Sequence, residues 1–150
     1  LAPIYSSKFK RVLTESGYPA IKPPWGTLTA LNLNNGKIIW QSPFGEYKEL
    51  TKKGMDLTGT ENFGGATATA GDIVIATGTL DKKIYIFNAI NGDILYDLEL
   101  PYIGSAPPTT YMSNGEQYIL VHATGGFSLS KGYPNLVEEG NALIALKLKK

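Results

Sequence analysis

The sequence predicts an all-β fold that forms part of a β-propeller, and three observations support this prediction. Seventeen glycines and nine prolines interrupt the chain every few residues. The stretches between them have strand length and are rich in Ile, Leu, Val, Tyr and Thr. A strand–turn–strand unit then returns at a regular interval, which is typical of propeller blades.

The first clear unit is a hairpin expected over Thr27–Asn34 and Lys37–Ser42, with Asn35-Gly36 between the strands. Asn-Gly between two apolar runs is the strongest short-range hairpin signal, because a type I′ turn needs positive φ at both central residues. The sequence therefore predicts a two-residue type I′ turn here.

This unit repeats further along the chain. Asn91-Gly92 takes the place of Asn35-Gly36, and the interval between Gly36 and Gly92 is 56 residues. Each copy ends in an aromatic residue, Trp40 in the first and Tyr96 in the second. An aromatic residue at a repeated position is expected to dock one blade on the next and to have no chemical role.

With strands named A to D outward from the channel, the chain is expected to contain about two and a quarter blades. The first blade contributes strands C and D. The expected strands of a complete second blade and an incomplete third are Ala66–Ala70, Asp72–Thr77, Lys83–Ile90 and Asp93–Leu98, then Thr109–Ser113, Gln117–Thr124 and Ala142–Lys149. Because closure takes at least about four blades, residues 1–150 are expected to be the C-terminal fragment of a single propeller domain, with residues 1–21 leading in from the preceding blade.

The amino-acid composition of the chain excludes several classes of binding partner. Fourteen Lys and Arg against 13 Asp and Glu leave a net charge of +1, so no strong field is available to hold a nucleic-acid backbone. Cysteine is absent and His122 is the single histidine, which excludes thiolate and multi-histidine metal sites. The longest apolar runs fall far short of the ~20 residues of a membrane-spanning helix. A small molecule or a protein is the expected partner.

Segments of unusual composition fall in the connections that a propeller places on one face of the ring. They are Pro23–Gly26, Thr58–Gly65, Thr79–Lys83 and Gly125–Phe127. Their convergence predicts a ligand site at that end of the channel. Between them, Glu46–Lys53 is expected to be a solvated loop of mixed charge.

Taken in order, these motifs resemble the C-terminal region of the membrane-bound quinoprotein glucose dehydrogenase family. The resemblance covers roughly Gly17–Lys150 and rests on Pro23–Trp40, Asn62–Gly65, Thr79–Asp81, Phe87–Gly92 and Gly115–Tyr118. It implies an eight-bladed propeller of tryptophan-docking repeats that binds pyrroloquinoline quinone (PQQ) and Ca²⁺. It also implies oxidation of a sugar or alcohol at the periplasmic face of the bacterial inner membrane, with electrons passed to membrane quinone.

The resemblance also implies roles for particular residues. Asp81 resembles the acidic residue with which the family helps hold the quinone, and Pro24, Trp25 and Asn62 lie in segments that line its pocket. A planar tricarboxylate needs aromatic packing, amide and backbone donors, and fixed charges. The general base and the Ca²⁺ ligands of the family lie in earlier blades, so no catalytic or metal-binding residue is expected in this chain.

Phe127 marks a departure from the family pattern near the substrate. The best-known members carry His after the paired glycines, where this chain has Gly125-Gly126-Phe127. An apolar ring cannot hydrogen-bond a sugar hydroxyl or share a proton. The sequence therefore leaves the substrate open between an aldose and another alcohol.

Two functions remain open on the sequence. The first is the C-terminal part of a quinoprotein dehydrogenase, inactive as an isolated fragment. The second is a non-enzymatic propeller of the same repeats that acts as a protein-interaction scaffold in envelope assembly. Two of the predicted cofactor residues also have a structural interpretation. Trp25 is expected either to line the cofactor pocket or to pack within its own loop. Asp81 is expected either to bind the cofactor or to cap a turn. The open blade faces are expected to meet the remaining blades or a second copy of the fragment.

Overall fold

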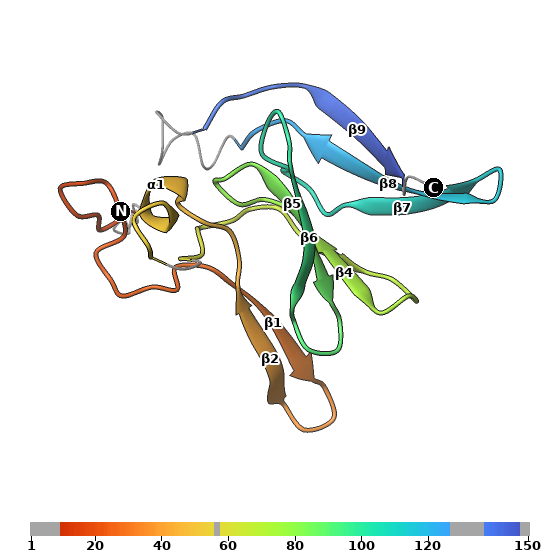
Figure 1. Ribbon diagram of the computed structural model, residues 1–150, viewed down its shortest axis with the longest axis horizontal. Helices are drawn as coiled ribbons and strands as arrows, with labels where there is room; N and C mark the ends of the chain where they lie inside the picture. Colours follow the sequence, from red (N-terminus) through yellow and green to blue (C-terminus); the bar gives the residue numbers. More distant parts are fainter. Residues whose placement is uncertain (1–9, 56–57, 127–136, 148–150) are drawn as a thin grey trace, which may run out of the picture.

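The computed structural model describes residues 10–55, 58–126 and 137–147, which fold into three antiparallel sheets. The sheets fan out from the region around a short helix, α1 (Lys48–Thr51) (Figure 1). Among these residues, no helix has the length and apolar character needed to cross a membrane.

The sheets match the three blades expected from the repeat. The first consists of β1 (Thr27–Asn32) and β2 (Lys37–Pro43). The second, in the order β3-β4-β5-β6, consists of Ala66–Ala68, Ile73–Ala76, Lys83–Asn88 and Ile94–Glu99. The third consists of β7 (Thr109–Ser113), β8 (Glu116–Ala123) and β9 (Ala142–Lys147). The all-β, partial-propeller fold is confirmed.

The turn between β1 and β2 differs from the predicted type I′ turn. Asn32 pairs with Lys37, so four residues form the loop. Gly36 has a φ of +69°, whereas Asn35 is not among the residues with positive φ. The Gly36 amide donates to the Asn32 carbonyl at 2.7 Å. The prediction of a two-residue turn was wrong because this wider loop needs only one left-handed residue, the glycine.

Repeated asparagines stabilise both copies of this loop through their side chains. Asn32 Oδ1 accepts a hydrogen bond from the amide two residues later at 2.9 Å, and Asn88 Oδ1 does so at 2.8 Å. Asn35 and Asn91 accept equivalent bonds at the loop exit, at 3.0 and 3.1 Å. Such bonds satisfy amides that the strand ladder leaves open.

Trp40 docks the first blade on the second. Its indole Nε1 donates to the Ala89 carbonyl at 2.9 Å, and its ring stacks on Phe87 with centroids 6.5 Å apart. Ser42 Oγ donates to the Gly92 carbonyl at 2.5 Å. Trp40 therefore has the docking role that the sequence predicts for it, whereas Tyr96 at the repeated position is 57% exposed and docks on no blade of the described chain.

Three apolar clusters fill the spaces between blades and beneath the loops. One joins the first two blades and contains Phe44, Ala76, Tyr85 and Phe87. Another joins the second and third blades and contains Ile75, Ile84, Leu100 and Val121. Because neighbouring residues of β4 and β5 point to opposite faces, these two central strands of the middle blade are buried on both sides, whereas β6 is largely exposed.

The segment Glu46–Lys53, predicted to be a solvated loop, is partly structured and partly buried. It contains α1, and Tyr47 just before the helix is 7% exposed. Tyr47 packs in the third apolar cluster with Leu80, Ile103 and Val137, and Trp25 packs against that cluster. The charged residues on either side of Tyr47, Glu46 and Lys48, concealed this buried aromatic residue in the sequence.

Gly92 and Gly36 occupy the same turn position, so matched alanine substitutions isolate the docking contact. Both glycines have positive φ, +78° and +69°, which costs an alanine about 1–2 kcal/mol at either place. A Cβ at Gly36 meets nothing within 4 Å, whereas at Gly92 it falls 2.5 Å from the Trp40 ring. We expect Gly92→Ala to lower the free energy of unfolding by about 1–3 kcal/mol more than Gly36→Ala, measured by urea denaturation. The difference should vanish in a Trp40→Ala background, and its persistence there would contradict docking.

Candidate functional site

Loops from the first two blades, which the sequence predicts to contribute to a ligand site, meet in one cluster. The Trp25 amide donates to the Thr58 carbonyl at 2.7 Å, and the Phe44 amide donates to the Gly26 carbonyl at 3.0 Å. The Thr60 amide donates to the Phe44 carbonyl at 2.9 Å. The Pro-Pro-Trp-Gly segment is therefore bonded to the chain at two later points, Phe44 and Thr58, 18 and 33 positions further on.

Close backbone approach explains two glycines in these loops. A Cβ at Gly26 would lie 1.9 Å from the Thr60 carbonyl oxygen, and one at Gly59 would lie 2.2 Å from the Gly26 carbonyl oxygen. Gly59 also has a φ of +65°, which other residues adopt at a steric cost. Side chains at either position would separate the two loops.

Buried threonines supply hydrogen bonds where the loops lack a strand partner. Thr58, Thr60 and Thr79 are each at most 1% exposed. Thr58 Oγ1 accepts from the Tyr47 amide and Thr60 Oγ1 accepts from the Leu80 amide, both at 3.1 Å. Buried backbone amides need such partners, so these hydroxyls help hold the loops in one conformation.

The carboxylate of Asp81 lies at the centre of this loop cluster and is 6% exposed. Oδ2 accepts the Glu46 amide at 2.9 Å and also the Tyr85 hydroxyl. Oδ1 accepts the Thr79 hydroxyl at 2.5 Å and the Lys83 amide at 3.2 Å. A carboxylate offers about four acceptor positions, and groups of this chain occupy all four. Asp81 thus ties the loop after β2 to the turn between β4 and β5.

The side chain of Lys83 forms two ion pairs next to the hydrogen bonds of Asp81. Its ammonium lies 2.8 Å from Glu46 Oε1 and 3.1 Å from Asp97 Oδ1, and the Lys83 and Glu46 side chains are 16% and 12% exposed. Burial opposes ionisation of both partners, yet hydrogen bonds from Lys83 and Thr51 lower the pKa of Glu46. Hydrogen bonds to Glu46 and Asp97 likewise raise the pKa of Lys83 against its desolvation. The pair stays charged over the neutral range.

Tyr85 remains a hydrogen-bond donor to Asp81 under all ordinary conditions. Burial, followed by the charge of Asp81, raises the pKa of Tyr85 far above its usual range. The phenol is 1% exposed and lies at the start of β5. The sequence reasoning missed Tyr85 because alternation in a strand marks a buried position and does not identify the partner of its hydroxyl.

Trp25 is half-buried and lies among other aromatic rings. Its indole Nε1 donates to the Ile21 carbonyl at 2.7 Å. The ring stacks against Tyr18 at 6.1 Å and meets Tyr47 edge-on at 5.3 Å. Pro24, which follows a cis peptide bond, is exposed. Trp25 thus belongs to the loop cluster, and Pro24 lies at its surface.

Asn62 reaches the cluster from the other side, through a β-bridge to Thr79. The residue is half-buried, and its side-chain amide makes no hydrogen bond within the described part of the chain. The preceding Glu61 is held by Arg11 through two bonds of 2.7 and 2.8 Å. Asn62 therefore combines a fixed backbone with an open polar side chain.

The structure brings three of the sequence-predicted residues together around Thr79 and Leu80. Asn62 bridges Thr79, Asp81 accepts its hydroxyl, and Trp25 packs on the cluster that contains Leu80. Phe127 lies outside the described residues. Within them, no group of three or more His, Cys, Asp or Glu side chains could hold a metal ion.

Comparison with known proteins agrees with this architecture. The family model of the glucose/ethanol/alcohol dehydrogenase β-propeller domain, designated PQQ, matches residues 2–119. The quinate/shikimate dehydrogenase (quinone) of Acinetobacter baylyi is 33% identical over 81% of this chain and 16% of its own length. The quinoprotein glucose dehydrogenase A of Acinetobacter calcoaceticus is 30% identical, with the same coverage of both chains. The chain thus spans about a sixth of the length of these relatives.

Solved structures share the fold. The quinohemoprotein alcohol dehydrogenase of Comamonas testosteroni has a TM-score of 0.53 at 25% identity, over 73% of this chain and 14% of that one. A europium-containing methanol dehydrogenase reaches a TM-score of 0.66 at 17% identity, over 85% of this chain and 24% of that one. The matched domain and the shared repeats together place this chain in the family of PQQ-dependent quinoprotein dehydrogenases, whose members act on small-molecule sugars and alcohols.

Proposed function

We propose that the chain supplies the C-terminal blades and one side of the cofactor pocket of a PQQ-dependent dehydrogenase. The enzyme oxidises an aldose or another alcohol at the periplasmic face of the inner membrane and passes the electrons to a membrane quinone. The observation that carries the proposal is the meeting of Asn62, Asp81 and Trp25 around Thr79 and Leu80. Relatives named for quinate/shikimate, glucose and glycerol support a substrate with several hydroxyl groups.

The donor chemistry of the cluster fits PQQ. The Asn62 amide has no partner among the described residues, and its N–H groups suit a carboxylate or a ring carbonyl of the cofactor. Trp25 offers an aromatic wall whose own N–H is already bonded to Ile21. When bound, PQQ supplies a two-electron acceptor, while the protein supplies binding, orientation and electrostatics.

Asp81 acts on this pocket by position and charge. Because both of its oxygens accept two hydrogen bonds from the chain, it has no acceptor position left for the cofactor. Its role is to hold the turn between β4 and β5 against the loop after β2, and thereby to hold Thr79 under Asn62. Tyr85 and Lys83 are positioning residues that act through it.

In this proposal, Pro24 shapes the surface of the Trp25 loop, and Phe127 is the apolar neighbour of the substrate. The general base and the Ca²⁺ ligands come from blades that precede this chain.

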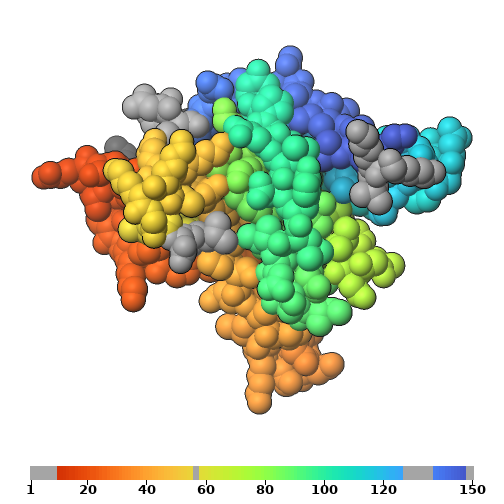
Figure 2. Space-filling model, viewed as in Figure 1, coloured from red at the N-terminus to blue at the C-terminus, as the bar shows by residue number. Residues whose placement is uncertain are grey.

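Further blades of the parent protein cover the open faces of the three sheets. Tyr96 holds the repeat position of Trp40, yet it is 57% exposed on β6. Figure 2 shows β6 on the near face and the β1–β2 hairpin projecting from the body. Large apolar side chains are exposed on the outer sheets at Ile38 (58%), Ile39 (59%), Met112 (65%) and Leu143 (64%). Such patches mark surfaces that meet a partner.

Asn62→Ala tests the cofactor role directly. Loss of a hydrogen bond to a charged group costs roughly 1.5–3 kcal/mol, so the affinity of the full-length protein for PQQ with Ca²⁺ should fall at least about tenfold. Isothermal titration calorimetry measures it. Asn34→Ala, in the outer β1–β2 loop, is the matched control and should bind as the unmodified protein does. Equal affinities for the two variants would remove Asn62 from the pocket.

Tyr85→Phe tests the hydrogen bond by which the Tyr85 hydroxyl helps hold Asp81 in place. It removes a buried donor to a carboxylate, so the free energy of unfolding should fall by roughly 1.5–3 kcal/mol, and the affinity for PQQ should fall with it. Tyr111→Phe, whose ring is 42% exposed, should leave both unchanged. Thermal denaturation and PQQ titration give the two readouts. A stability loss with unchanged PQQ affinity would separate the anchor from the cofactor pocket.

The proposed reaction is tested by titrating the full-length protein with PQQ in calcium and then adding aldoses and alcohols. Saturable binding, followed by spectral reduction with at least one substrate, is the expected outcome. The isolated 150 residues should show no turnover, because the proposed base and Ca²⁺ ligands lie elsewhere. Absence of PQQ binding by the full-length protein would contradict the dehydrogenase proposal, and turnover by the fragment would contradict the placement of the base.

A further inference from the structure

The ion pair between Arg11 and Glu61 is bidentate and partly buried. Arg11 is the single arginine among the 14 basic residues of the chain. Its Nε lies 2.7 Å from Glu61 Oε2 and its Nη2 lies 2.8 Å from Glu61 Oε1, across 50 positions of sequence. The guanidinium fork thus binds both carboxylate oxygens, a geometry that a lysine ammonium cannot match. The two side chains are only 17% and 26% exposed, so salt screens this pair less than a fully exposed one.

A closed turn before β1 holds Arg11 in place. Leu13 pairs with Pro19 in a β-bridge, and the Ala20 amide donates to the Val12 carbonyl at 3.0 Å. Arg11 is the residue just before this turn. Its backbone is therefore directed by bonds that close within the turn and that do not depend on Glu61.

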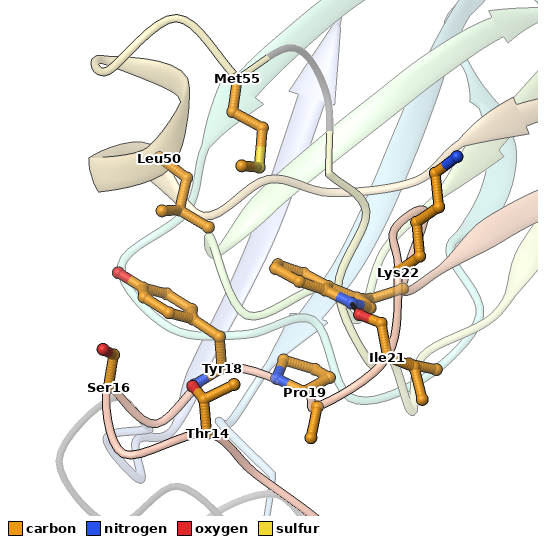
Figure 3. A pocket seen from close by; sticks show the side chains of 10 residues that line it. Thr14, Ser16, Tyr18, Pro19, Ile21, Lys22, Leu50 and Met55 are labelled. Atoms are coloured by element: carbon orange, nitrogen blue, oxygen red, sulfur yellow. Dashed lines mark hydrogen bonds between the residues drawn. The ribbon is translucent and has the colours of Figure 1, made fainter.

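Tyr18 attaches the same turn to the rest of the molecule. Its hydroxyl donates to Glu49 in α1 at 2.8 Å, and its ring stacks against Trp25 with the centroids 6.1 Å apart. Tyr18 also lines one side of an open depression of about 520 Å³, with Leu50 beside it (Figure 3). The turn therefore gives Arg11 a support that is already fixed to α1.

Glu61 lies in a short segment with Asn62, the open polar side chain of the proposed cofactor pocket. This segment pairs with the second blade through an isolated β-bridge between Asn62 and Thr79. The Thr60 hydroxyl donates to the Glu61 carbonyl at 3.1 Å. An isolated bridge holds a chain less firmly than a ladder, in which hydrogen-bonded pairs recur along the strands. The grip of Arg11 on the neighbouring side chain is thus a further fixed point for Asn62.

We propose that Arg11 is a positioning residue of the cofactor pocket, which clamps Glu61 so that the Asn62 amide keeps the orientation in which it donates to PQQ. This inference rests on the proposed dehydrogenase function. Arg11 acts through Glu61 and does not touch the cofactor. Because the strength of a hydrogen bond depends on its angle as well as its length, loss of the clamp weakens the bond from Asn62 without removing any group that contacts PQQ.

Two single substitutions distinguish positioning from a direct effect of charge on the anionic cofactor. Arg11→Met and Glu61→Met each break the pair, so each should lower the affinity of the full-length protein for PQQ with Ca²⁺ at least about fivefold, a size typical of coupling between side chains in contact. The double variant should bind no more weakly than either single one. A direct effect of charge would give opposite signs, since removing the negative charge would strengthen binding. Isothermal titration calorimetry measures the affinities, and opposite signs would overturn the proposal.

A double-mutant cycle tests whether Arg11 acts through Asn62. In an Asn62→Ala background, Arg11→Met should change the affinity for PQQ by less than about twofold, because the group that it positions is gone. Lys147→Met, which breaks the 2.9 Å ion pair with Glu116 in the third blade, is the control and should leave the affinity unchanged. An equal loss from Arg11→Met with and without the Asn62 side chain would contradict the positioning role.

Amide hydrogen exchange of the cofactor-free, full-length protein tests the clamp without PQQ. The Thr60 and Phe63 amides are bonded to carbonyls of other segments, so both report on the backbone around Asn62. Arg11→Met should raise their exchange rates severalfold, whereas Lys147→Met should not. Unchanged rates in Arg11→Met would overturn the clamp. Failure of the unmodified protein to bind PQQ would count against the dehydrogenase function itself, while the exchange rates would still decide whether Arg11 holds this segment.

Discussion

Four hydrogen bonds to the buried carboxylate of Asp81 hold two blades together at the loop cluster. A charge with this little exposure is stable in a protein only when its acceptor positions are occupied. Each donor comes from a segment that the site needs in place: the loop after β2, the turn after β4 and the start of β5. The ammonium group of Lys83 pairs with the neighbouring carboxylates of Glu46 and Asp97, while its backbone amide donates to Asp81. The geometry around Asn62 therefore depends on this anchor.

The blades are joined by different means at the outer rim and at the channel face. At the rim, Trp40 stacks on Phe87 and donates to the carbonyl of Ala89, so apolar contact carries the junction. At the channel face, buried threonines and glycine backbones in contact replace apolar packing. Polar loops can present open groups to a ligand, whereas a docked tryptophan cannot, so the loop cluster is the better candidate for a binding site.

Trp25 connects the loop cluster to the segment before β1. Its amide belongs to the loop cluster through Thr58, while its ring lines a depression with Tyr18 and Met55. This arrangement accounts for a tryptophan in a proline-rich loop that lies outside the docking repeat.

The sequence by itself determined the repeat, the strands and the family, because strand periodicity, turn residues and docking aromatics are local signals. It also predicted that Trp25, Asn62 and Asp81 lie on loops of one face, since blade order dictates where connections lie. Only the tertiary structure decided what Asp81 bonds to, because the Glu46 amide and the Tyr85 hydroxyl come from different segments. It also decided the width of the Asn-Gly loops and the burial of Tyr47. Partners distant in the sequence leave no local pattern, so side-chain contacts between blades become visible only when the chain is folded.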